Sequence, residues 1–507
     1  MKWEKRNCLL ISIPIALFLS GCAGVTPVKE TDPTVLRLEE VVKQNPNDPQ
    51  KRVELAAVYL GKYLQKKEKR YIDGALEEAR EAIRLKPDLG RAHAQLSWIL
   101  MIKATESHDE GLIYESKREY EEALRINPEL ADSERVHPPH LGAAMIYLSK
   151  SRKDKKYVDR AIKELKEGIR LKPNSAPTHH LLGQIYYIQE KNELALLELK
   201  EALRLNPDDP ETHKALAKVY IGQGKNELAI SELKEAARLN PDDPETHKAL
   251  GGIYEEKVYS GEKGWDDEAI ELAIKEFKEV IRLTPEDAYA HRTLGWLYRH
   301  KELFDLNVFE AKEALRLKKS ATNYRALGDA YLWKGDYDKA IKEFREALRL
   351  KPDFAEIHTY IAYTYFLEGR FEDAIEEFEK YFGSLESPYG DINSYRIIWQ
   401  NLSLKHIGKN AEAKKLIEDF ATGYKGEGWE LDVFRYHQGK LTESELISRP
   451  RHKGDRCEAY FYIGYQHLLK GDKQKAREYF QKTLDTKAFG YYEYIGARAR
   501  LEEMGAK

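Results

Sequence analysis

The sequence predicts an all-α solenoid built from repeated pairs of helices, and two observations predict it. First, a helical pattern that ends in Arg-(Leu/Ile)-x-Pro recurs, with its prolines at Pro87, Pro128, Pro173, Pro207, Pro241, Pro285 and Pro352. Second, the segment Asn206–Leu216 occurs again without change at Asn240–Leu250. The intervals between these prolines are 34 to 45 residues up to Pro285, a period typical of solenoids. Because one such unit cannot bury its apolar face alone, the units must stack.

Each unit reads as two helices joined by a turn, as residues 210–241 illustrate. Small and large apolar residues mark one face of each helix, at Leu216, Ala217 and Tyr220 in the first and at Ala229, Leu233 and Ala236 in the second. Residues 222–226 (GQGKN) supply the turn between them. Pro241 ends the second helix, because the residue before a proline disfavours the α conformation.

This pattern resembles the tetratricopeptide repeat (TPR). One unit fills every marked position of that repeat, with Tyr324, Leu327, Gly328, Tyr331, Gly335, Ala340, Phe344, Ala347 and Pro352. The resemblance implies a right-handed superhelical solenoid of about ten to eleven helix pairs, with about nine units in residues 47–388. Four units, those that end at Pro87, Pro128, Pro173 and Pro285, are longer than the others. We expect their extra residues in the connections between helices.

The regular repeat fades after Tyr381, and residues 389–507 form a divergent TPR-like region. Its sequence resembles the end of the NlpI lipoprotein family, at Trp429, Val433, Phe434, Tyr436, Gly439, Leu441, Thr442, Leu446, Glu458, Phe461, Tyr462, Gly464, Gly471, Ala476 and Phe480. That family consists of envelope adaptors that bring a protease and peptidoglycan hydrolases together, so the resemblance implies partners of these kinds. Residues 490–505 should form a last amphipathic helix that closes the exposed end of the stack.

The first 21 residues predict a lipoprotein signal peptide. Lys2, Lys5 and Arg6 precede a twelve-residue apolar run, which is too short to span a bilayer, for which about 20 residues are needed. The run ends in Leu-Ser-Gly-Cys at residues 19–22, which resembles the lipobox of bacterial lipoproteins. The resemblance implies cleavage before Cys22 and its lipidation, with residues 22–46 forming a short linker and first helix. Ala23 replaces the Asp of a familiar inner-membrane retention signal, so the periplasmic face of the outer membrane is the expected location.

Composition and motifs argue against several classes of function. The formal net charge of −3 gives no support to bulk nucleic-acid binding. Phosphate-binding, zinc-protease, serine-hydrolase and calcium-loop spacings do not occur, so the sequence predicts no enzyme, metal or cofactor. Histidines do recur at one repeat position, but equivalent positions on stacked helices lie about 8–10 Å apart, too far to converge on one ion. We expect these histidines to pack between helices: His93, His179, His213, His247, His291 and His358.

A basic and aromatic surface is the candidate binding site. In the TPR family the first helix of each unit lines the inside of the superhelix, and that register places Lys214, Lys248, Arg292 and Arg325 at one equivalent position. Arginine and aromatic residues are enriched at binding hot spots. The candidate partner-binding residues are Lys214, Lys218, Lys248, Arg292, Trp296, Arg299, Arg325, Trp333, Tyr363 and Phe366. An acidic or C-terminal segment of another envelope protein is the expected ligand.

Together these observations predict a lipid-anchored, non-catalytic scaffold or adaptor in the bacterial envelope. An assembly factor for a secretion, pilus or polysaccharide-export system is the nearest alternative, because the same surface would serve it. An envelope enzyme and a purely structural spacer are the remaining alternatives. Turnover by the pure protein would establish the first of these, and inner-surface substitutions that change no binding would support the second.

Overall fold

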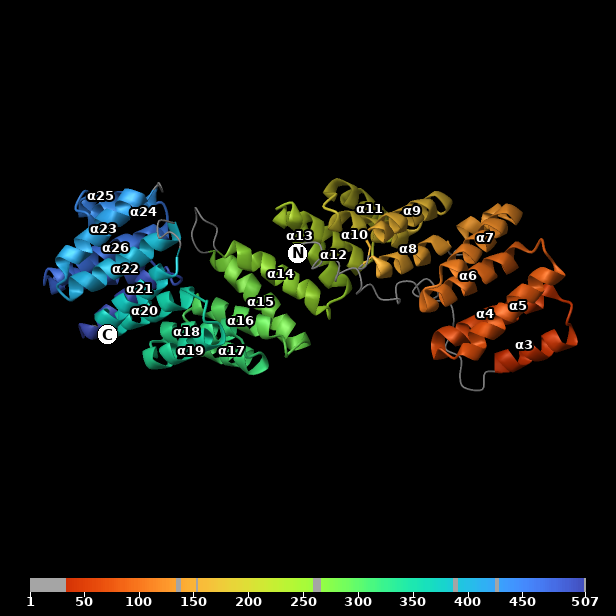
Figure 1. Ribbon diagram of the computed structural model, residues 1–507, viewed down its shortest axis with the longest axis horizontal. Helices are drawn as coiled ribbons and strands as arrows, with labels where there is room; N and C mark the ends of the chain where they lie inside the picture. The colour runs from red at the N-terminus through yellow and green to blue at the C-terminus, as the bar shows by residue number, and fades with distance from the viewer. Residues whose placement is uncertain are drawn as a thin grey trace. The chain divides into compact units, whose positions relative to one another are not determined.

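The computed structural model describes residues 33–133, 138–151, 154–258, 266–385, 391–424 and 428–505. Within these ranges it contains 26 α-helices, α3 to α28, one short 3-10 helix, η2, and no strand (Figure 1). The prediction of an all-α repeat array is confirmed. The chain divides into two compact units, Met1–Leu239 and Asn240–Lys507, which are described separately.

The first unit contains the early repeats. Its helices are α3 (Pro33–Gln44), α4 (Pro49–Lys66), α5 (Lys69–Leu85), α6 (Gly90–Ser107), α7 (Glu110–Ile126), η2 (Pro128–Asp132), α8 (Pro139–Lys150), α9 (Lys156–Leu171), α10 (Ala176–Ile188), α11 (Asn192–Leu205), α12 (Pro210–Gly222) and α13 (Asn226–Leu239). From α4 onward the helices pack most closely as sequential pairs, α4 with α5, α6 with α7 and so on.

The second unit contains the later repeats and the divergent C-terminal part. Its helices are α14 (Pro244–Lys257), α15 (Asp267–Leu283), α16 (Ala288–Arg299), α17 (Phe304–Leu317), α18 (Ala321–Lys334), α19 (Tyr337–Leu350), α20 (Glu356–Glu368), α21 (Phe371–Gly383), α22 (Asp391–His406), α23 (Asn410–Gly423), α24 (Trp429–His437), α25 (Glu443–Ser448), α26 (Lys453–Leu469), α27 (Lys473–Asp485) and α28 (Tyr492–Glu503). Sequential pairing continues to α22 with α23 and returns at α26 with α27. In the described ranges this gives eleven pairs, in agreement with the ten to eleven expected. The exact domain boundaries stay predictions.

Glycine allows the two helices of a repeat to approach closely. A methyl group at Gly328 on α18 would lie 2.6 Å from ring atoms of Phe344 on α19, and one at Gly183 on α10 would lie 2.7 Å from Leu199 on α11. The Phe344 and Leu199 side chains are fully buried. Because protein interiors are packed as densely as organic crystals, neither crossing has room for a larger residue.

The longer repeats differ from the sequence expectation. In the units that end at Pro87 and Pro128, the extra residues lengthen both helices rather than the connection, so α4 and α6 each span 18 residues and their partners 17. Only two residues separate each pair, and Lys67 and His108 end the first helices with φ of 56°. A single left-handed residue is a common way to stop a helix. In the other two long units part of the connection, residues 152–153 and 259–265, lies outside the described ranges.

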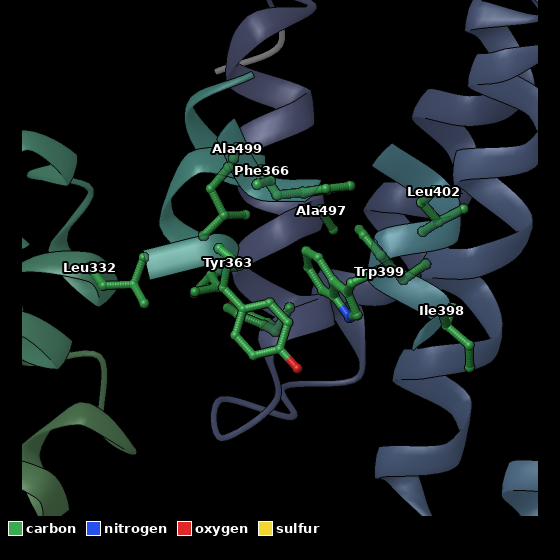
Figure 2. Close-up of a cluster of buried hydrophobic side chains, with 14 of the residues drawn as sticks. Leu332, Tyr363, Phe366, Ile398, Trp399, Leu402, Ala497 and Ala499 are labelled. Atoms are coloured by element: carbon green, nitrogen blue, oxygen red, sulfur yellow. The ribbon is translucent and has the colours of Figure 1, made fainter. Parts of the chain in front are cut away.

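The C-terminal helix also differs from expectation. The sequence predicted that residues 490–505 would close the end of the stack, but α28 lies against α26 and α27 and also reaches α20. Figure 2 shows side chains of α28, Ala497 and Ala499, in one cluster with Tyr363, Phe366 and Trp399. The physical reason is the small-residue face of α28, where a methyl group at Gly496 would lie 2.7 Å from Phe461. This face lets the helix enter an aromatic core rather than cover its edge.

Candidate partner-binding site

The repeated histidines form links between helices. In six repeats the Nδ1 atom of the histidine lies 2.6–2.7 Å from a glutamate Oε2 on the second helix, in the pairs His93–Glu119, His179–Glu198, His213–Glu232, His247–Glu276, His291–Glu310 and His358–Glu377. In five of them Nε2 lies 3.0 Å from the carbonyl oxygen of the preceding repeat proline. Packing between helices is thus confirmed for these histidines, and each has a specific polar partner.

The sequence carries a signal for these links that the histidine pattern alone does not reveal. In four of the pairs the glutamate follows the histidine by 19 residues: His179–Glu198, His213–Glu232, His291–Glu310 and His358–Glu377. The hydrogen bond that His93 donates to Glu119 raises the pKa of His93 above its usual value, although burial opposes it. The same contact lowers the pKa of Glu119. Among the described residues, no group of three or more His, Cys, Asp and Glu side chains is arranged to hold a metal ion.

The ten candidate binding residues fall into two units and three environments. Lys214 and Lys218 lie on α12 in the first unit, and the other eight lie in the second unit. Lys218 is exposed, whereas Lys214, Lys248, Arg292, Trp296 and Arg325 are half-buried. Four are buried: Arg299, Trp333, Tyr363 and Phe366. That all ten contact a partner stays a prediction, and the structure brings only four of them together around one cavity.

That cavity lies on the first helices of successive repeats in the second unit and has a volume of about 400 Å³. Its floor and walls come from α14, α16, α17, α18 and α20, and the segment before and at the start of α28 adds Gly490 and Tyr492. The lining residues are Glu255, Arg292, Thr293, Trp296, Arg299, Asn307, Ala311, Arg325, Ala326, Asp329, Tyr360, Gly490 and Tyr492. We call it the inner pocket.

One arginine of the inner pocket forms an ion pair within the protein. Arg299 Nη1 donates to Asp329 Oδ2 at 2.8 Å, and both side chains are about 90% buried. Its guanidinium also lies 4.6 Å from the centre of the Trp333 ring. Tyr492 Oη lies 3.4 Å from the other oxygen of Asp329, so α28 is joined to the same network. This pair therefore has a structural role at the wall of the pocket.

Arg292 and Arg325 have much weaker partners. The Nη1 atom of Arg292 lies 3.4 Å from the Asn323 side-chain oxygen, and that of Arg325 lies 3.4 Å from Tyr360 Oη. Each guanidinium also lies over a tyrosine ring, at 5.2 Å for Tyr289 and 5.6 Å for Tyr360. Among the described residues neither has a carboxylate within 4.0 Å. Half-buried charges are normally paired, so these two cations are available to an anionic ligand.

The inner pocket also carries a carboxylate, near Arg292. Glu255 on α14 is half-buried and accepts a hydrogen bond of 3.1 Å from Tyr289 Oη. Burial raises the pKa of Glu255, although the nearby Arg292 charge opposes the shift. Asn307 on α17 is 4% exposed, and its Nδ2 atom has no hydrogen-bond partner in the described structure. The pocket thus offers both hydrogen-bond donors and an acceptor.

The buried aromatic candidates pack inside the molecule. Trp333, Tyr363 and Phe366 lie in the core that α28 completes (Figure 2), with Tyr492 4.6 Å from the Tyr363 ring centre. Arg498 on α28 donates to the Trp333 carbonyl, and Arg500 donates to the Phe366 and Leu367 carbonyls. These carbonyls end α18 and α20, where a cation is favourable. The sequence register placed these three side chains on the inner helices but gave no sign that α28 covers them.

Comparison with known families identifies the repeats. A model described as TPR repeat matches residues 183–224, 218–258 and 328–369, and one described as Tetratricopeptide repeat matches residues 458–486. The chain is a tetratricopeptide-repeat protein. The last match lies on α26 and α27, within the region that the sequence described as divergent. TPR proteins are usually non-catalytic scaffolds for protein–protein interaction.

Several solved TPR structures are similar to parts of this TPR protein. A thermophilic TPR protein in Thermus thermophilus is 24% identical over 38% of this chain and all of its own, with a TM-score of 0.28. PilW, a type IV pilus biogenesis factor, is 16% identical over 42% of this chain and 92% of its own, with a TM-score of 0.36. A TPR protein from Parabacteroides merdae is 17% identical over 52% and 99%, with a TM-score of 0.35. No curated protein matches the sequence.

The described helices were also compared with the requirements of a membrane span. Within the residues that the structure describes, every helix is too short or too polar to cross a bilayer. The predicted signal peptide and Cys22 lie outside the described residues.

Proposed function

We propose that this TPR protein is a non-catalytic scaffold that is anchored in the bacterial envelope by lipid on Cys22 and holds other envelope proteins on its inner helices. The observation that carries the proposal is the inner pocket, which Arg292 and Arg325 line without a carboxylate partner among the described residues. Aromatic rings of Trp296 and Tyr360 lie beside them. This combination of cations and aromatic surface is typical of protein-binding hot spots.

The anchor rests on the sequence. Acylation requires the thiol of Cys22, and several acyl chains hold a protein to a membrane where one chain gives only marginal binding. Cys22→Ser should therefore move the protein from the membrane to the soluble fraction of cells. If the variant stays with membranes, protein contacts rather than lipid hold it there. By resemblance to the NlpI family, a protease or a peptidoglycan hydrolase is the kind of partner to look for.

The scaffold role is tested by crosslinking in intact cells. A photoreactive amino acid in place of Trp296 should form a discrete crosslinked product with an envelope protein, which mass spectrometry then identifies. The same amino acid in place of Phe309, which is 56% exposed on α17, is the matched control for an aromatic residue away from the inner pocket. Equal products at both positions, or none at Trp296, would contradict binding at the pocket.

Charge reversal gives a second measurement. Arg292→Glu with Arg325→Glu should weaken capture of that crosslinked partner by about 2 kcal/mol or more if the pairs are desolvated. Capture by the wild type should also fall with added salt, since exposed charges are screened over about 8 Å at physiological ionic strength. Arg316→Glu, on an outward helix surface where it pairs with Glu313, is the control. Circular dichroism must show that the double variant is folded; wild-type capture by a folded variant would exclude this surface.

A further inference from the structure

The charges of the inner pocket are arranged in a way that a purely acidic ligand would not match. Arg299 and Asp329 neutralise each other through a 2.8 Å hydrogen bond. The charges left without an ion-pair partner among the described lining residues are the guanidinium groups of Arg292 and Arg325 and the carboxylate of Glu255. A ligand that satisfies all three needs two negative groups and one positive group.

The spacing of the two arginines favours two separate anionic groups. Arg292 lies on α16 and Arg325 on α18, at equivalent positions of neighbouring repeats. Arg292 reaches toward Asn323 on α18 and Arg325 toward Tyr360 on α20, so the two guanidinium groups are offset by one repeat along the pocket. Two carboxylates on one short molecule can each meet one arginine, and a guanidinium binds a carboxylate through paired hydrogen bonds.

The positive group is required by Glu255. This carboxylate is half-buried on α14, and its one hydrogen bond in the described structure comes from Tyr289. Placing a second carboxylate there would add like-charge repulsion, whereas an ammonium group would supply a charge-assisted hydrogen bond. Asn307 lines the pocket and is 4% exposed, and its Nδ2 atom, without a hydrogen-bond partner among the described residues, is a further donor for a ligand oxygen.

Size limits the ligand as well. The cavity of about 400 Å³ lies near the lower end of the range of small-molecule sites, about 300–1,000 Å³. Gly490 and Tyr492 add a wall at the α18 side, where Tyr492 is held by Asp329 and by the Tyr363 ring. The rings of Trp296 and Tyr360 supply apolar surface for a short carbon chain.

We propose that the inner pocket binds a small acidic zwitterion, an amino acid or short peptide that carries two carboxylates and one ammonium group. Arg292 and Arg325 each bind a carboxylate, and Glu255 binds the ammonium group. This goes beyond the scaffold role, because the ligand is a small molecule and its binding needs no partner protein. Free amino acid and short peptide share this chemistry.

Calorimetry on the purified full-length protein in detergent tests the proposal, with L-glutamate and the dipeptide Ala-Glu as the two probes. At least one should bind saturably, and the probe that binds more tightly shows whether the ligand is a free amino acid or a short peptide. Glutamine lacks one carboxylate and glutarate lacks the ammonium group, so each should bind at least about tenfold more weakly than glutamate, the cost of one charge-assisted hydrogen bond. Absence of binding by both probes, or equal binding of glutamate, glutamine and glutarate, overturns the proposal.

Variants assign the groups. Glu255→Gln should weaken glutamate binding by about tenfold or more, because the ammonium contact is lost, but should not weaken glutarate binding, which loses only a like-charge repulsion. Arg325→Gln should weaken glutamate binding and remove its advantage over glutamine. Arg316→Gln, outside the pocket, should change nothing. If the Glu255→Gln variant keeps wild-type preference for glutamate over glutarate, the assignment is wrong. Crosslinking to a partner is a separate readout, so failure of either proposal is visible without the other.

Discussion

The early repeats of the first unit and the C-terminal region from α22 to α28 use different means to hold helices together. In α10 and α11, a small residue meets a leucine at the crossing, and the link from His179 to Glu198 fastens the pair. The C-terminal region is instead built on an aromatic core, in which the rings of Trp399 and Phe461 stack. Two of its buried carboxyls, Glu458 and Glu493, accept hydrogen bonds from aromatic side chains.

The two regions also differ in how far their contacts reach along the chain. The His179–Glu198 link joins residues 19 apart, whereas Trp399 Nε1 donates to Glu493 across 94 residues and Arg498 reaches the Trp333 carbonyl across 165. Contacts between nearest neighbours make stability a sum over repeats. Contacts across many helices make a region open as one unit. We therefore expect a destabilising substitution to loosen only neighbouring helices in the early repeats, but to loosen many helices together in the C-terminal region.

Removing the central aromatic side chain should have the largest effect. Trp399→Ala leaves a cavity in the C-terminal core and removes the 3.1 Å hydrogen bond to Glu493. Large-to-small changes of this kind cost about 3–5 kcal/mol of the free energy of unfolding. Urea denaturation measures the loss, and hydrogen exchange should speed up together in α20, α22, α26 and α28.

A matched change in the early repeats sharpens the contrast. Leu199→Ala also removes a fully buried side chain and should cost about 2–5 kcal/mol. Its effect on hydrogen exchange should be confined to α10 to α13. If both variants change exchange over equally long stretches, the two regions do not differ in cooperativity.

The glycine crossing provides the next largest effect. Gly328→Ala would place a methyl group 2.6 Å from the Phe344 ring and should destabilise by about 1–3 kcal/mol through overpacking. At Gly252, on α14, a methyl group meets no atom within 4 Å. Gly252→Ala should therefore raise stability by about 0.5–1 kcal/mol through helix propensity alone. Thermal unfolding measures both, and the same sign for the two variants would contradict the close crossing.

The two regions should respond to pH differently. Burial raises the pKa of Glu458 and Glu493 in the C-terminal core, and their mutual repulsion adds to the shift of Glu458. A carboxyl with a raised folded pKa holds its proton more tightly when folded, so stability should fall as pH rises above about 4.5. Glu458→Gln should reduce this dependence, as hydrogen exchange in α26 at pH 5 and 6.5 would measure.

The pKa of the carboxyl in the His93–Glu119 link is shifted in the opposite direction from those of Glu458 and Glu493. Because the folded pKa of His93 is raised, its stabilisation is complete below about 6.5 and is lost as pH rises through the folded pKa. Because that of Glu119 is lowered, its stabilisation is present above about 4.3 and is lost as pH falls. Between pH 5 and 6.5, α6 and α7 should therefore keep constant protection. A fall there as steep as in α26 would contradict the contrast.

Loss of a single His–Glu link should have the smallest effect. Glu198→Ala leaves the Nδ1 atom of His179 without its 2.7 Å partner and should cost about 1 kcal/mol, the usual net value of a hydrogen bond. The pKa of His179, which Glu198 raises against the effect of burial, should also fall, as NMR titration of the imidazole would measure. An unchanged histidine titration would show that the link does not form in solution.

The repeat architecture could be predicted from the sequence because its contacts are local. Leu216, Ala229 and Leu233 recur at helical spacing, and partners within a pair are about 20 to 30 residues apart, so periodicity alone reveals them. The recurring histidine position follows from the same periodicity, whereas the histidine pattern alone does not identify the glutamate partner. The length of a repeat does not show where its extra residues lie. In α4 to α7 these residues lengthen the helices, although longer connections were expected.

Only the tertiary structure decided which inner side chains face open space. The same register placed Arg292, Arg325, Trp333 and Tyr363 on inner helices, yet the first two border a cavity and the last two are buried under α28. Tyr492 reaches Asp329 across 163 residues, and no periodic pattern encodes such a contact. Helical spacing determines which face of a helix is inward. Whether that face meets solvent or another helix depends on where a distant segment packs, which only the assembled chain decides.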